Sequence, residues 1–437
     1  MNESPLIIEI DSLGSSGEGI GSFEGYKFFV ENALPQEKVK ILPLIRKKNY
    51  GTAKLLEVLS PSLDRKDPIC PHFSSCGGCQ LMHLSYEKQL EFKRQKVIDA
   101  LRKIGNIQDA EVSTCHPSPQ KLNYRNKIQL PARIEDRKIS FGLYEKKSHH
   151  LIPIDECKIH CSIGEKIYQK IIAKIPINLP IRHLLIKSSS FSQKSLIIFV
   201  SKEKPNQDWI DFGKKLISTF PEIAGVIHNL HDTTENVILG RTFYPLAGVD
   251  FLEEKLYDLT FQISSASFFQ VNPRQAEILY QRAVQLADLK GYETVLDAYC
   301  GVGTLSLFFA RHVKKVIGVE SVSFAVKNAK KNSQLNQISN CSFFCSFAER
   351  FIQSLEEKID LLLINPPRKG CEESFLQKIK DLGPKKIIYI SCDPATLARD
   401  LKIIRSFDYE ISRVEPLDMF PQTAHVETIV LLEKKPT

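Results

Sequence analysis

The sequence predicts a soluble multidomain protein with an amino-terminal small antiparallel β-barrel, a central α+β region and a carboxy-terminal doubly wound α/β domain. Three observations predict this fold class. The 437 residues exceed what one hydrophobic core usually holds, and 43% of them are hydrophobic and 25% charged, as in globular proteins. Residues 5–60 combine short β-rich stretches with glycine turns. From about residue 276, helical patterns alternate with buried apolar runs, which indicates a parallel sheet with crossover helices.

The amino-terminal barrel is expected in residues 1–62. Apolar residues recur with a period of two in this region, and turns such as "GSSGEGIGSFEG" are rich in glycine. This pattern is typical of short strands rather than helices. Small barrels commonly bind oligonucleotides across an open face, so the region is a candidate nucleic-acid-binding element.

The central region is expected in residues 63–262. It begins with a cysteine-rich segment, 70–79, and continues with an amphipathic helix, 85–105, that ends at a glycine. We expect this helix to pack either on the central region or on the carboxy-terminal domain. The pattern beyond residue 112 is mixed and predicts an α+β region.

The carboxy-terminal domain is expected in residues 263–437. Its apolar runs are short enough to be buried strands, and helical patterns separate most of them. Ligands of such sheets bind at the carboxyl ends of the strands. The predicted strands are "TVLDAY" (294–299), "KVIGVE" (315–320), "DLLLINPP" (360–367), "KIIYISC" (386–392) and "VETIVLLEK" (426–434).

The formal net charge of +8 permits a polyanionic partner without requiring one. Three stretches interleave basic residues with tyrosines: "IRKKNYGTAK" (45–54), "YRNKIQLPAR" (124–133) and "LYEKKSHH" (143–150). Such surfaces contact phosphates and stack bases, although each stretch alone also fits a solvated loop.

Nothing in the sequence indicates a membrane. No run reaches the roughly 18 uncharged apolar residues that a spanning helix needs, and Met1 is followed by polar residues rather than by a signal sequence. We expect a cytoplasmic monomer without an obligate protein partner.

The motif "VLDAYCGVGTLSL" indicates a nucleoside-containing ligand. Asp297 ends a predicted strand, and Gly301 and Gly303 open the next helix, where a ligand can approach the backbone closely. Glu320 ends the next strand and is placed to accept hydrogen bonds from ribose hydroxyls. Ser306 replaces the third glycine of the dinucleotide motif, and Asp297 would repel a pyrophosphate. These features favour S-adenosylmethionine over NAD or FAD.

Two further strand ends carry polar groups, Asn365 and Cys392. The Asp-Pro pair after Cys392 indicates that a helix begins there, and its amino end would favour a thiolate. A thiolate that adds to carbon 6 of uracil makes carbon 5 nucleophilic toward a sulfonium methyl group. The carbon 5 proton must then be removed by a base, for which Glu427 is the first candidate and His425 the alternative.

Five motifs occur in order in the carboxy-terminal half of the chain. They are "FFQVNPRQAE", "LDAYCGVGTLSL", "NPPRKG", "YISCDPATLARDL" and "HVETIVLL". Together they resemble the RNA uracil-5-methyltransferases of the RumA/TrmA type. The resemblance implies that Cys392 is the nucleophile and Glu427 the base. It also implies that four residues contact the methyl donor or the target base: Gln270, Tyr299, Glu320 and Asn365.

The amino-terminal half resembles one branch of this family. Residues 5–60 look like a TRAM domain, a small RNA-binding barrel. The segment that begins "CPHFSSCGGCQ" reads C-x5-C-x2-C, and with one distant cysteine such a set binds either zinc or a [4Fe–4S] cluster. The resemblance favours a cluster held by Cys70, Cys76, Cys79 and Cys157, with Cys161 as the rival fourth ligand.

The barrel and the cysteines together point to the branch that modifies 23S ribosomal RNA. The alternatives are a tRNA uracil-5-methyltransferase and a catalytically impaired iron–sulfur RNA-binding protein. Asn365 motivates the last alternative, because many family members carry Asp at this position. The amide still suits uracil, since it accepts from N3–H and donates to O4, but it cannot accept a proton. An amino-methyltransferase or a cytosine-5 enzyme with Cys371 as nucleophile fits the motifs less well.

Overall fold

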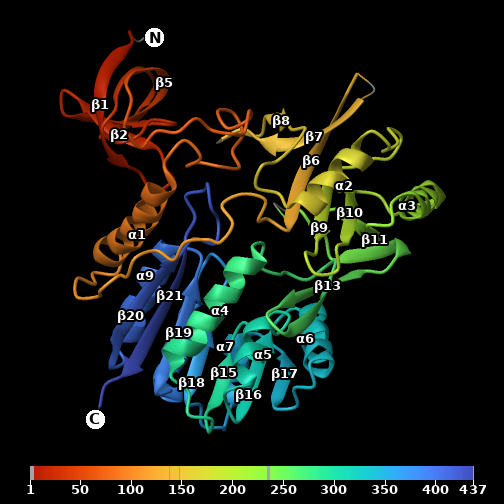
Figure 1. Cartoon of the computed structure of the whole chain (residues 1–437). Coiled ribbons are helices and arrows are strands. Elements are labelled where there is room, and N and C mark those ends of the chain that lie inside the picture. The colour runs from red at the N-terminus through yellow and green to blue at the C-terminus, as the bar shows by residue number, and fades with distance from the viewer. Residues whose placement is uncertain (1–3, 137, 147, 234–236, 437) are drawn as a thin grey trace.

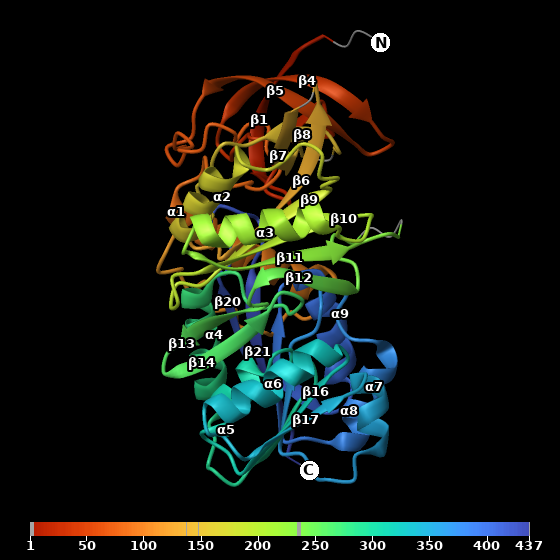
Figure 2. The ribbon, with the colours of Figure 1, turned by 90° about the vertical axis from the view of Figure 1, so that its right-hand side faces the viewer.

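The computed structural model describes residues 4–136, 138–146, 148–233 and 237–436. It contains a closed barrel and two large sheets (Figure 1). Figure 2 shows the barrel at one end, the central sheet in the middle and the carboxy-terminal domain at the other end. None of the helices in these ranges is both long and apolar enough to cross a lipid bilayer.

The barrel is built from β1 (Leu6–Leu13), β2 (Gly19–Phe23), β3 (Tyr26–Val30), β4 (Lys38–Arg46) and β5 (Tyr50–Ser60). Its strand order is β1-β2-β3-β5-β4, and pairing of β1 with β4 closes it. The predicted antiparallel pairing has one exception, because β3 and β5 run parallel. A Cβ atom at Gly21 would lie 2.2 Å from the carbonyl oxygen of Glu9, so only glycine fits where β1 and β2 meet.

The central sheet contains β6 (Lys127–Glu135), β7 (Lys138–Tyr144), β8 (Leu151–Pro153), β9 (His183–Ser188), β10 (Ser195–Ser201), β11 (Ile223–Leu230) and β12 (Thr242–Gly248). Their order is β12-β11-β10-β9-β6-β7-β8. One face is covered by α2 (Ser162–Ile172) and α3 (Gln207–Thr219), whose apolar residues share a core with the strands. A hairpin of β13 (Phe251–Leu256) and β14 (Leu259–Ser264) leads into the carboxy-terminal domain.

The strands of the carboxy-terminal sheet are β15 (Thr294–Asp297), β16 (Lys315–Glu320), β17 (Cys341–Cys345), β18 (Leu361–Ile364), β19 (Lys386–Ser391), β20 (Tyr409–Leu417) and β21 (Glu427–Lys434). Their order is β17-β16-β15-β18-β19-β21-β20. The five strands from β17 to β19 are parallel. This pairing was predicted for β16, β15, β18 and β19, whereas β17 and β20 were not predicted as strands. The prediction that the last apolar run is also parallel is wrong, because β21 pairs antiparallel with β19 and with β20.

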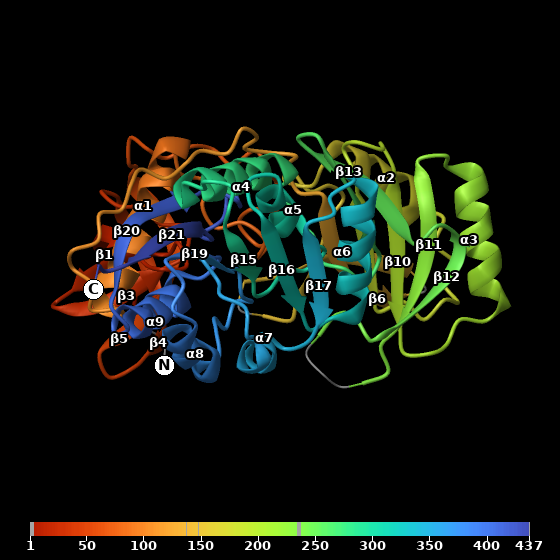
Figure 3. The same cartoon turned by 90° about the horizontal axis from the view of Figure 1, so that it is seen from below.

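Helices cover both faces of this sheet (Figure 3). One face carries α4 (Pro273–Ala287), α5 (Thr304–Ala310) and α6 (Ser323–Leu335). The other carries α7 (Ala348–Phe351), a 3-10 turn (Ile352–Ser354), α8 (Glu373–Leu382) and α9 (Pro394–Arg405). The doubly wound arrangement was predicted from the alternation of buried strands and helices.

The helix α1 (Tyr86–Lys103) packs on the carboxy-terminal domain. It contacts α9 and β20, and Val97, Ala100 and Leu101 belong to the core on that side of the sheet. Figure 1 shows α1 between the barrel and this sheet. The helix therefore connects the two ends of the molecule.

A buried ion pair fixes α1 to the loop between β20 and β21. The side chains of Lys93 and Asp418 are both fully buried and form a short hydrogen-bonded ion pair. Lys93 also donates to the carbonyl of Phe420 at 3.0 Å, and the Tyr86 hydroxyl donates to Asp418 at 2.9 Å. Removal of one charge leaves the other buried without its partner.

We expect Lys93→Met to lower the free energy of unfolding by about 3–5 kcal/mol, because Asp418 loses its counter-ion in a buried site. Urea unfolding followed by circular dichroism measures this loss. The double variant Lys93→Met/Asp418→Leu should recover most of it. Lys88→Met, which removes an exposed ion pair with Glu91 on the same helix, serves as the matched control and should leave the unfolding curve unchanged.

Candidate active site

The loop between β15 and α5 forms an open cradle. Gly301 and Gly303 have φ angles of 54° and 83°, which other residues rarely adopt. A Cβ atom at Gly301 would meet nothing within 4 Å, so this backbone faces open space. The Glu320 carboxylate accepts from the Gly301 N–H at 3.2 Å and from the Val322 N–H at 2.8 Å. The cradle and the carboxylate thus lie side by side, as the sequence predicted.

Asp297 lies buried at the base of this cradle. One carboxylate oxygen accepts from the Ser306 hydroxyl at 2.6 Å, and the other has no hydrogen-bond partner within the described residues. Burial raises the pKa of Asp297 to about 7, although the hydrogen bond from Ser306 lowers it. The unpartnered oxygen is available to a ligand in the cradle.

Tyr280 on α4 connects several of the predicted residues. Its buried hydroxyl lies 3.2 Å from the Thr304 hydroxyl and also hydrogen-bonds the side chain of Gln270. The charges of Asp297 and Glu427 both raise its pKa, so these carboxylates are near. Tyr280 was not predicted from the sequence, because an aromatic residue at helical spacing looks like part of the core.

Tyr299 is oriented differently from the other predicted ligand contacts. Its hydroxyl donates to Glu349 at 3.4 Å, and its ring packs on Phe375 of α8 with the centroids 5.6 Å apart. Its backbone N–H is near enough to the Asp297 carboxyl to lower the pKa of that group. The backbone of Tyr299 therefore faces the cradle, whereas the hydroxyl belongs to the layer of α7 and α8.

The two polar strand ends lie on neighbouring strands. Asn365 follows β18 and Cys392 follows β19, and these strands pair in parallel. The side-chain amide of Asn365 has no hydrogen-bond partner in the described ranges, so its donor and acceptor are both available. Glu427 begins β21, and its neighbour Thr428 pairs with Ser391. Antiparallel pairing therefore brings the start of β21 to the edge where Cys392 ends β19.

The electrostatics of this edge involve Cys392, Glu427 and Arg368. Burial raises the pKa of Glu427 to about 8, and the Arg368 guanidinium opposes this shift. Burial raises the pKa of the Cys392 thiol to about 11, with a further increase from the Glu427 charge and a decrease from Arg368. Each group thus lies within electrostatic reach of the other two.

The amino end of α9, which was predicted to favour a thiolate, is already capped by a carboxylate. Asp393 caps the helix and accepts from the N–H groups of Ala395 and Thr396 at 2.9 and 3.0 Å. Those donors are therefore occupied, and the Asp393 charge raises the pKa of Cys392. The Arg368 charge lowers the pKa of Cys392 and so favours the thiolate, a role that was not predicted from the sequence.

His425 lies two residues before Glu427, in the loop that leads into β21. Desolvation lowers its pKa to about 4, and the charges of Arg368 and Lys96 lower it further. The imidazole is therefore neutral at pH 7, with one nitrogen able to accept a proton. Because it lies two residues from Glu427, His425 stays the alternative candidate for the base.

The segment 418–426, which leads into β21, is held by α1 and by the cysteine-rich segment. Gln89 and Gln422 exchange two hydrogen bonds of 3.1 Å. The Gln80 N–H donates to the carbonyl of Gln422 at 3.0 Å, and its side chain accepts from the Ala424 N–H at 3.2 Å. The position of the Glu427 carboxylate therefore depends on how the cysteine-rich segment is folded.

Four of the predicted metal-ligating cysteines line one small cavity of about 30 Å³, with apolar neighbours such as Phe73. They are Cys70, Cys76, Cys79 and Cys157, and all four are free thiols. In the described part of the chain, no three or more His, Cys, Asp or Glu side chains lie close enough together to hold a metal ion. The thiols are neighbours without being in coordinating positions.

Cys161 lies outside this cavity. It is the residue before the first turn of α2, and its thiol hydrogen-bonds Ser188 of the central sheet. Cys157 lines the cavity instead.

Comparison with known proteins identifies the family of the chain. Residues 85–435 match the family model for tRNA (uracil-5-)-methyltransferase, and residues 5–56 match the TRAM domain. A Clostridium tetani protein named as an uncharacterized RNA methyltransferase is 40% identical, covering 97% of this chain and 95% of that protein. A Listeria monocytogenes protein of the same name is 38% identical over 97% of this chain and 96% of its own length.

A solved structure shows the same architecture. It is the tRNA (uracil-54, C5)-methyltransferase of Pyrococcus abyssi in complex with S-adenosyl-L-homocysteine, with 27% sequence identity and a TM-score of 0.75. The match covers 98% of this chain and all of that one. The resemblance inferred from the five motifs is thereby confirmed, and the chain belongs to the tRNA (uracil-5-)-methyltransferase family and carries an amino-terminal TRAM domain.

Proposed function

We propose that the protein methylates carbon 5 of a uridine in 23S ribosomal RNA, with S-adenosylmethionine as the methyl donor and Cys392 as a covalent nucleophile. One observation carries this proposal. Antiparallel pairing of β19 with β21 brings a thiol and a buried carboxylate, Cys392 and Glu427, to the same edge of the sheet. A covalent pyrimidine mechanism requires these two groups together.

The residues around the glycine cradle fit the methyl donor. The Gly301 backbone faces open space, and the Asp297 oxygen without a partner offers an acceptor to the cationic methionine end. The fixed carboxylate of Glu320 suits the ribose hydroxyls. Gln270 and Tyr280 hydrogen-bond each other beside Thr304, the first residue of α5. The donor supplies an electrophilic methyl group, and these residues bind and orient it.

In the proposed reaction, the Cys392 sulfur adds to carbon 6 of uracil as a thiolate, and the electron pair of the 5,6 double bond moves toward carbon 5 and oxygen 4. Carbon 5 then attacks the methyl group of S-adenosylmethionine, and S-adenosylhomocysteine leaves. Glu427 removes the proton from carbon 5. The double bond re-forms as the carbon–sulfur bond breaks, which returns the thiolate.

Asn365 and Arg368 support this chemistry from the loop after β18. The Asn365 amide is proposed to accept from uracil N3–H and to donate to O4, which identifies uracil without any proton transfer. Arg368 lowers the pKa of both Cys392 and Glu427. Its charge therefore stabilises the thiolate that starts the reaction and the carboxylate that completes it.

The rate should rise between pH 6 and pH 9. Glu427 accepts the carbon 5 proton only when ionised, and its pKa is about 8. The Cys392 thiolate fraction rises over the same range, because the pKa of the thiol is about 11. Single-turnover measurements with radiolabelled methyl donor test this expectation, and a rate that falls with pH would contradict it.

The choice of 23S ribosomal RNA follows the resemblance of the barrel and the cysteine-rich segment to that branch of the family. A second candidate substrate is tRNA. The Pyrococcus abyssi enzyme acts on tRNA and matches this chain over 98% of its length, so the set of domains alone does not separate the two substrates.

Mapping of methyluridine in a deletion strain tests the proposal. We expect one or more 5-methyluridines to disappear from 23S ribosomal RNA and to return when the gene is restored. Loss from tRNA instead would favour the second candidate. If both RNAs keep all their methyluridines, the protein is catalytically impaired and the proposal is wrong.

We further propose that Cys70, Cys76, Cys79 and Cys157 hold a [4Fe–4S] cluster with a structural role. Four soft thiols around one cavity suit such a cluster, with zinc as the alternative. The cluster would fix the cysteine-rich segment, which in turn holds the loop before Glu427 through Gln80.

Cys79→Ser should abolish iron binding, whereas Cys161→Ser should keep it, because Cys161 lies outside the cavity. Iron and acid-labile sulfide in protein purified without oxygen measure this, with about four irons per chain expected. Stoichiometric zinc in place of iron would contradict the cluster.

A further inference from the structure

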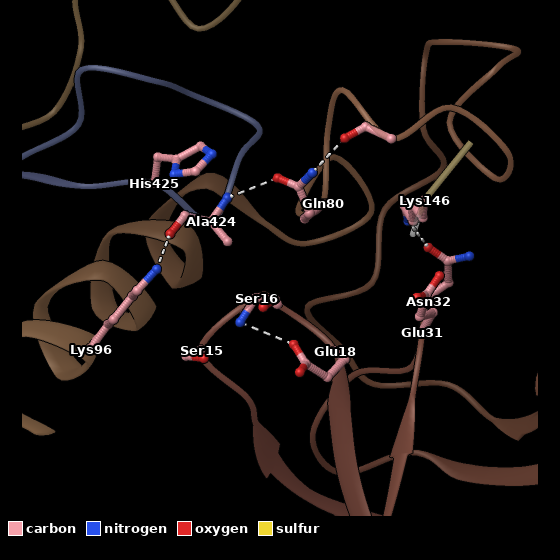
Figure 4. Close-up of a pocket in the computed structure, with 12 residues that line it drawn as sticks. Ser15, Ser16, Glu18, Glu31, Asn32, Gln80, Lys96, Lys146, Ala424 and His425 are labelled. Carbon is pink, nitrogen blue, oxygen red and sulfur yellow. Dashed lines mark hydrogen bonds between the residues drawn. The ribbon is translucent and has the colours of Figure 1, made fainter. Parts of the chain in front are cut away.

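A cavity of about 300 Å³ lies between the barrel and the carboxy-terminal domain. Its walls come from separate parts of the chain, as Figure 4 shows. Ser16 and Glu18 belong to the turn between β1 and β2, Lys96 to α1, Lys146 to the turn between β7 and β8, and His425 to the loop before β21. The volume is in the range of pockets that enclose small polar molecules or nucleosides.

The cavity is close to the proposed catalytic centre. His425 lines it, and Glu427 follows two residues later at the start of β21. The Cα atoms of residues two apart in a chain lie at most about 7 Å from each other. The ammonium group of Lys96 lies within electrostatic reach of Asp393, next to Cys392, and of Glu18 on the barrel. The cavity therefore lies next to the sheet edge that carries Cys392 and Glu427.

The polar groups in the walls are held in place. Lys96 donates to the carbonyl of Ala424 at 2.8 Å, and Lys146 donates to the side-chain oxygen of Asn32 at 2.9 Å. Glu18 accepts from the Ser16 N–H at 3.0 Å through one oxygen of its carboxylate. These contacts restrain the side chains before any ligand enters, which reduces the entropic cost of binding.

The charges in the walls select a neutral ligand. Two lysines, Lys96 and Lys146, face two carboxylates, Glu18 and Glu31, and His425 is neutral at pH 7 because its pKa is about 4. A site for a phosphate would have an excess of positive charge. A balanced set of donors and acceptors instead suits a nucleobase with its ribose, because the edge of a base carries both kinds of group.

We propose that this cavity binds the base and ribose of a nucleotide next to the target uridine in the substrate RNA. The inference rests on the proposed function, since it requires an RNA substrate at the catalytic edge. Glu18 accepts from an exocyclic amino group of that base, and Lys96 donates to a ring nitrogen or carbonyl. The cavity therefore favours a base with an amino group over uracil. Because Glu18 belongs to the barrel, the barrel contributes to recognition of the RNA sequence around the target uridine.

A set of RNA oligonucleotides tests the cavity with the full-length protein. Each oligonucleotide of about 20 nucleotides is centred on the uridine found by methyluridine mapping and carries one abasic nucleotide within three positions of it. Equilibrium binding to the wild-type protein should weaken by about tenfold for one adjacent position, as expected when one bound base is lost.

Glu18→Gln and Lys96→Met should each reduce that loss to less than about twofold, because the wall no longer recognises the base. The Glu18→Gln change is conservative for the turn, since the new amide oxygen still accepts from the Ser16 N–H. Glu24→Gln, in the exposed turn between β2 and β3 outside the cavity, is the matched control and should keep the full tenfold loss. Thermal unfolding of each variant verifies that the fold is intact.

The outcomes separate the two proposals. If the wild-type protein transfers no methyl group to the intact oligonucleotide, the proposed function fails. If it methylates the oligonucleotide while both cavity variants keep the wild-type dependence on the abasic position, only the cavity inference fails. Equal weakening at all positions would show a general electrostatic contact and would also overturn the inference.

Discussion

Replacement of Cys392 by serine should abolish methyl transfer, with a loss of at least about 10³-fold in the single-turnover rate. A serine hydroxyl is far less acidic than a thiol and does not add to carbon 6 at neutral pH. The side chain is only partly buried and follows the last residue of β19, so the substitution should leave the sheet intact. Transfer of a radiolabelled methyl group to RNA measures the effect.

Cys345→Ser is the matched control for this variant. Cys345 is an exposed free thiol at the end of β17, on the edge strand of the same sheet. It should retain the wild-type rate. Methylation by the Cys392→Ser protein at a rate near that of wild type would show that carbon 5 is activated without a covalent bond to this residue.

Glu427→Gln should transfer the methyl group once and then fail to release the RNA. Glutamine has the shape of glutamic acid but does not accept the carbon 5 proton, so the methylated base remains bound to Cys392. The buried site tolerates a neutral group, because at pH 7 the Glu427 carboxyl is largely protonated, with a pKa of about 8. Denaturing gel electrophoresis should show a stable protein–RNA adduct.

His425→Asn distinguishes the two candidate bases. If Glu427 is the base, the His425→Asn protein should release its product without accumulating an adduct, even where its affinity for RNA falls. Accumulation of the adduct in His425→Asn, together with normal release by Glu427→Gln, would transfer the role of the base to His425.

The fold was predictable because its signals are local. Period-two apolar patterns with glycine turns predicted the barrel, and strand–helix alternation predicted the doubly wound domain. The direction in which strands pair was harder to predict from the sequence. The apolar run 426–434 has the same pattern whether it pairs parallel or antiparallel, and only the structure shows that it is antiparallel to β19.

That pairing decides where the candidate base lies. Glu427 begins its strand, so in a wholly parallel sheet it would lie at the amino edge, far from Cys392 at the end of β19. The role that the family resemblance implies for Glu427 fits the structure only because β21 is reversed. Whether Glu427 performs that role remains a prediction.

The pKa of Cys392, the contacts of Tyr280 and the cavity beside His425 each depend on several helices, strands and loops at once. Short sequence motifs could not predict them. The state of the Cys392 thiol depends on burial, on Asp393 and on Arg368, which a helix start in the sequence does not reveal. Tyr280 looked like a core residue, because only the folded chain brings its hydroxyl to Thr304. The cavity beside His425 has walls from distant parts of the chain.

The most direct test of the central claim uses RNA in which uridine is replaced by 5-fluorouridine. Fluorine at carbon 5 blocks the final elimination, so a covalent mechanism leaves the methylated RNA attached to the enzyme. With S-adenosylmethionine and a 23S ribosomal RNA transcript, we predict an adduct whose peptide, identified by mass spectrometry, contains Cys392 and the added methyl group. No adduct with either ribosomal RNA or tRNA, or an equal yield from the Cys392→Ser protein, would contradict the account.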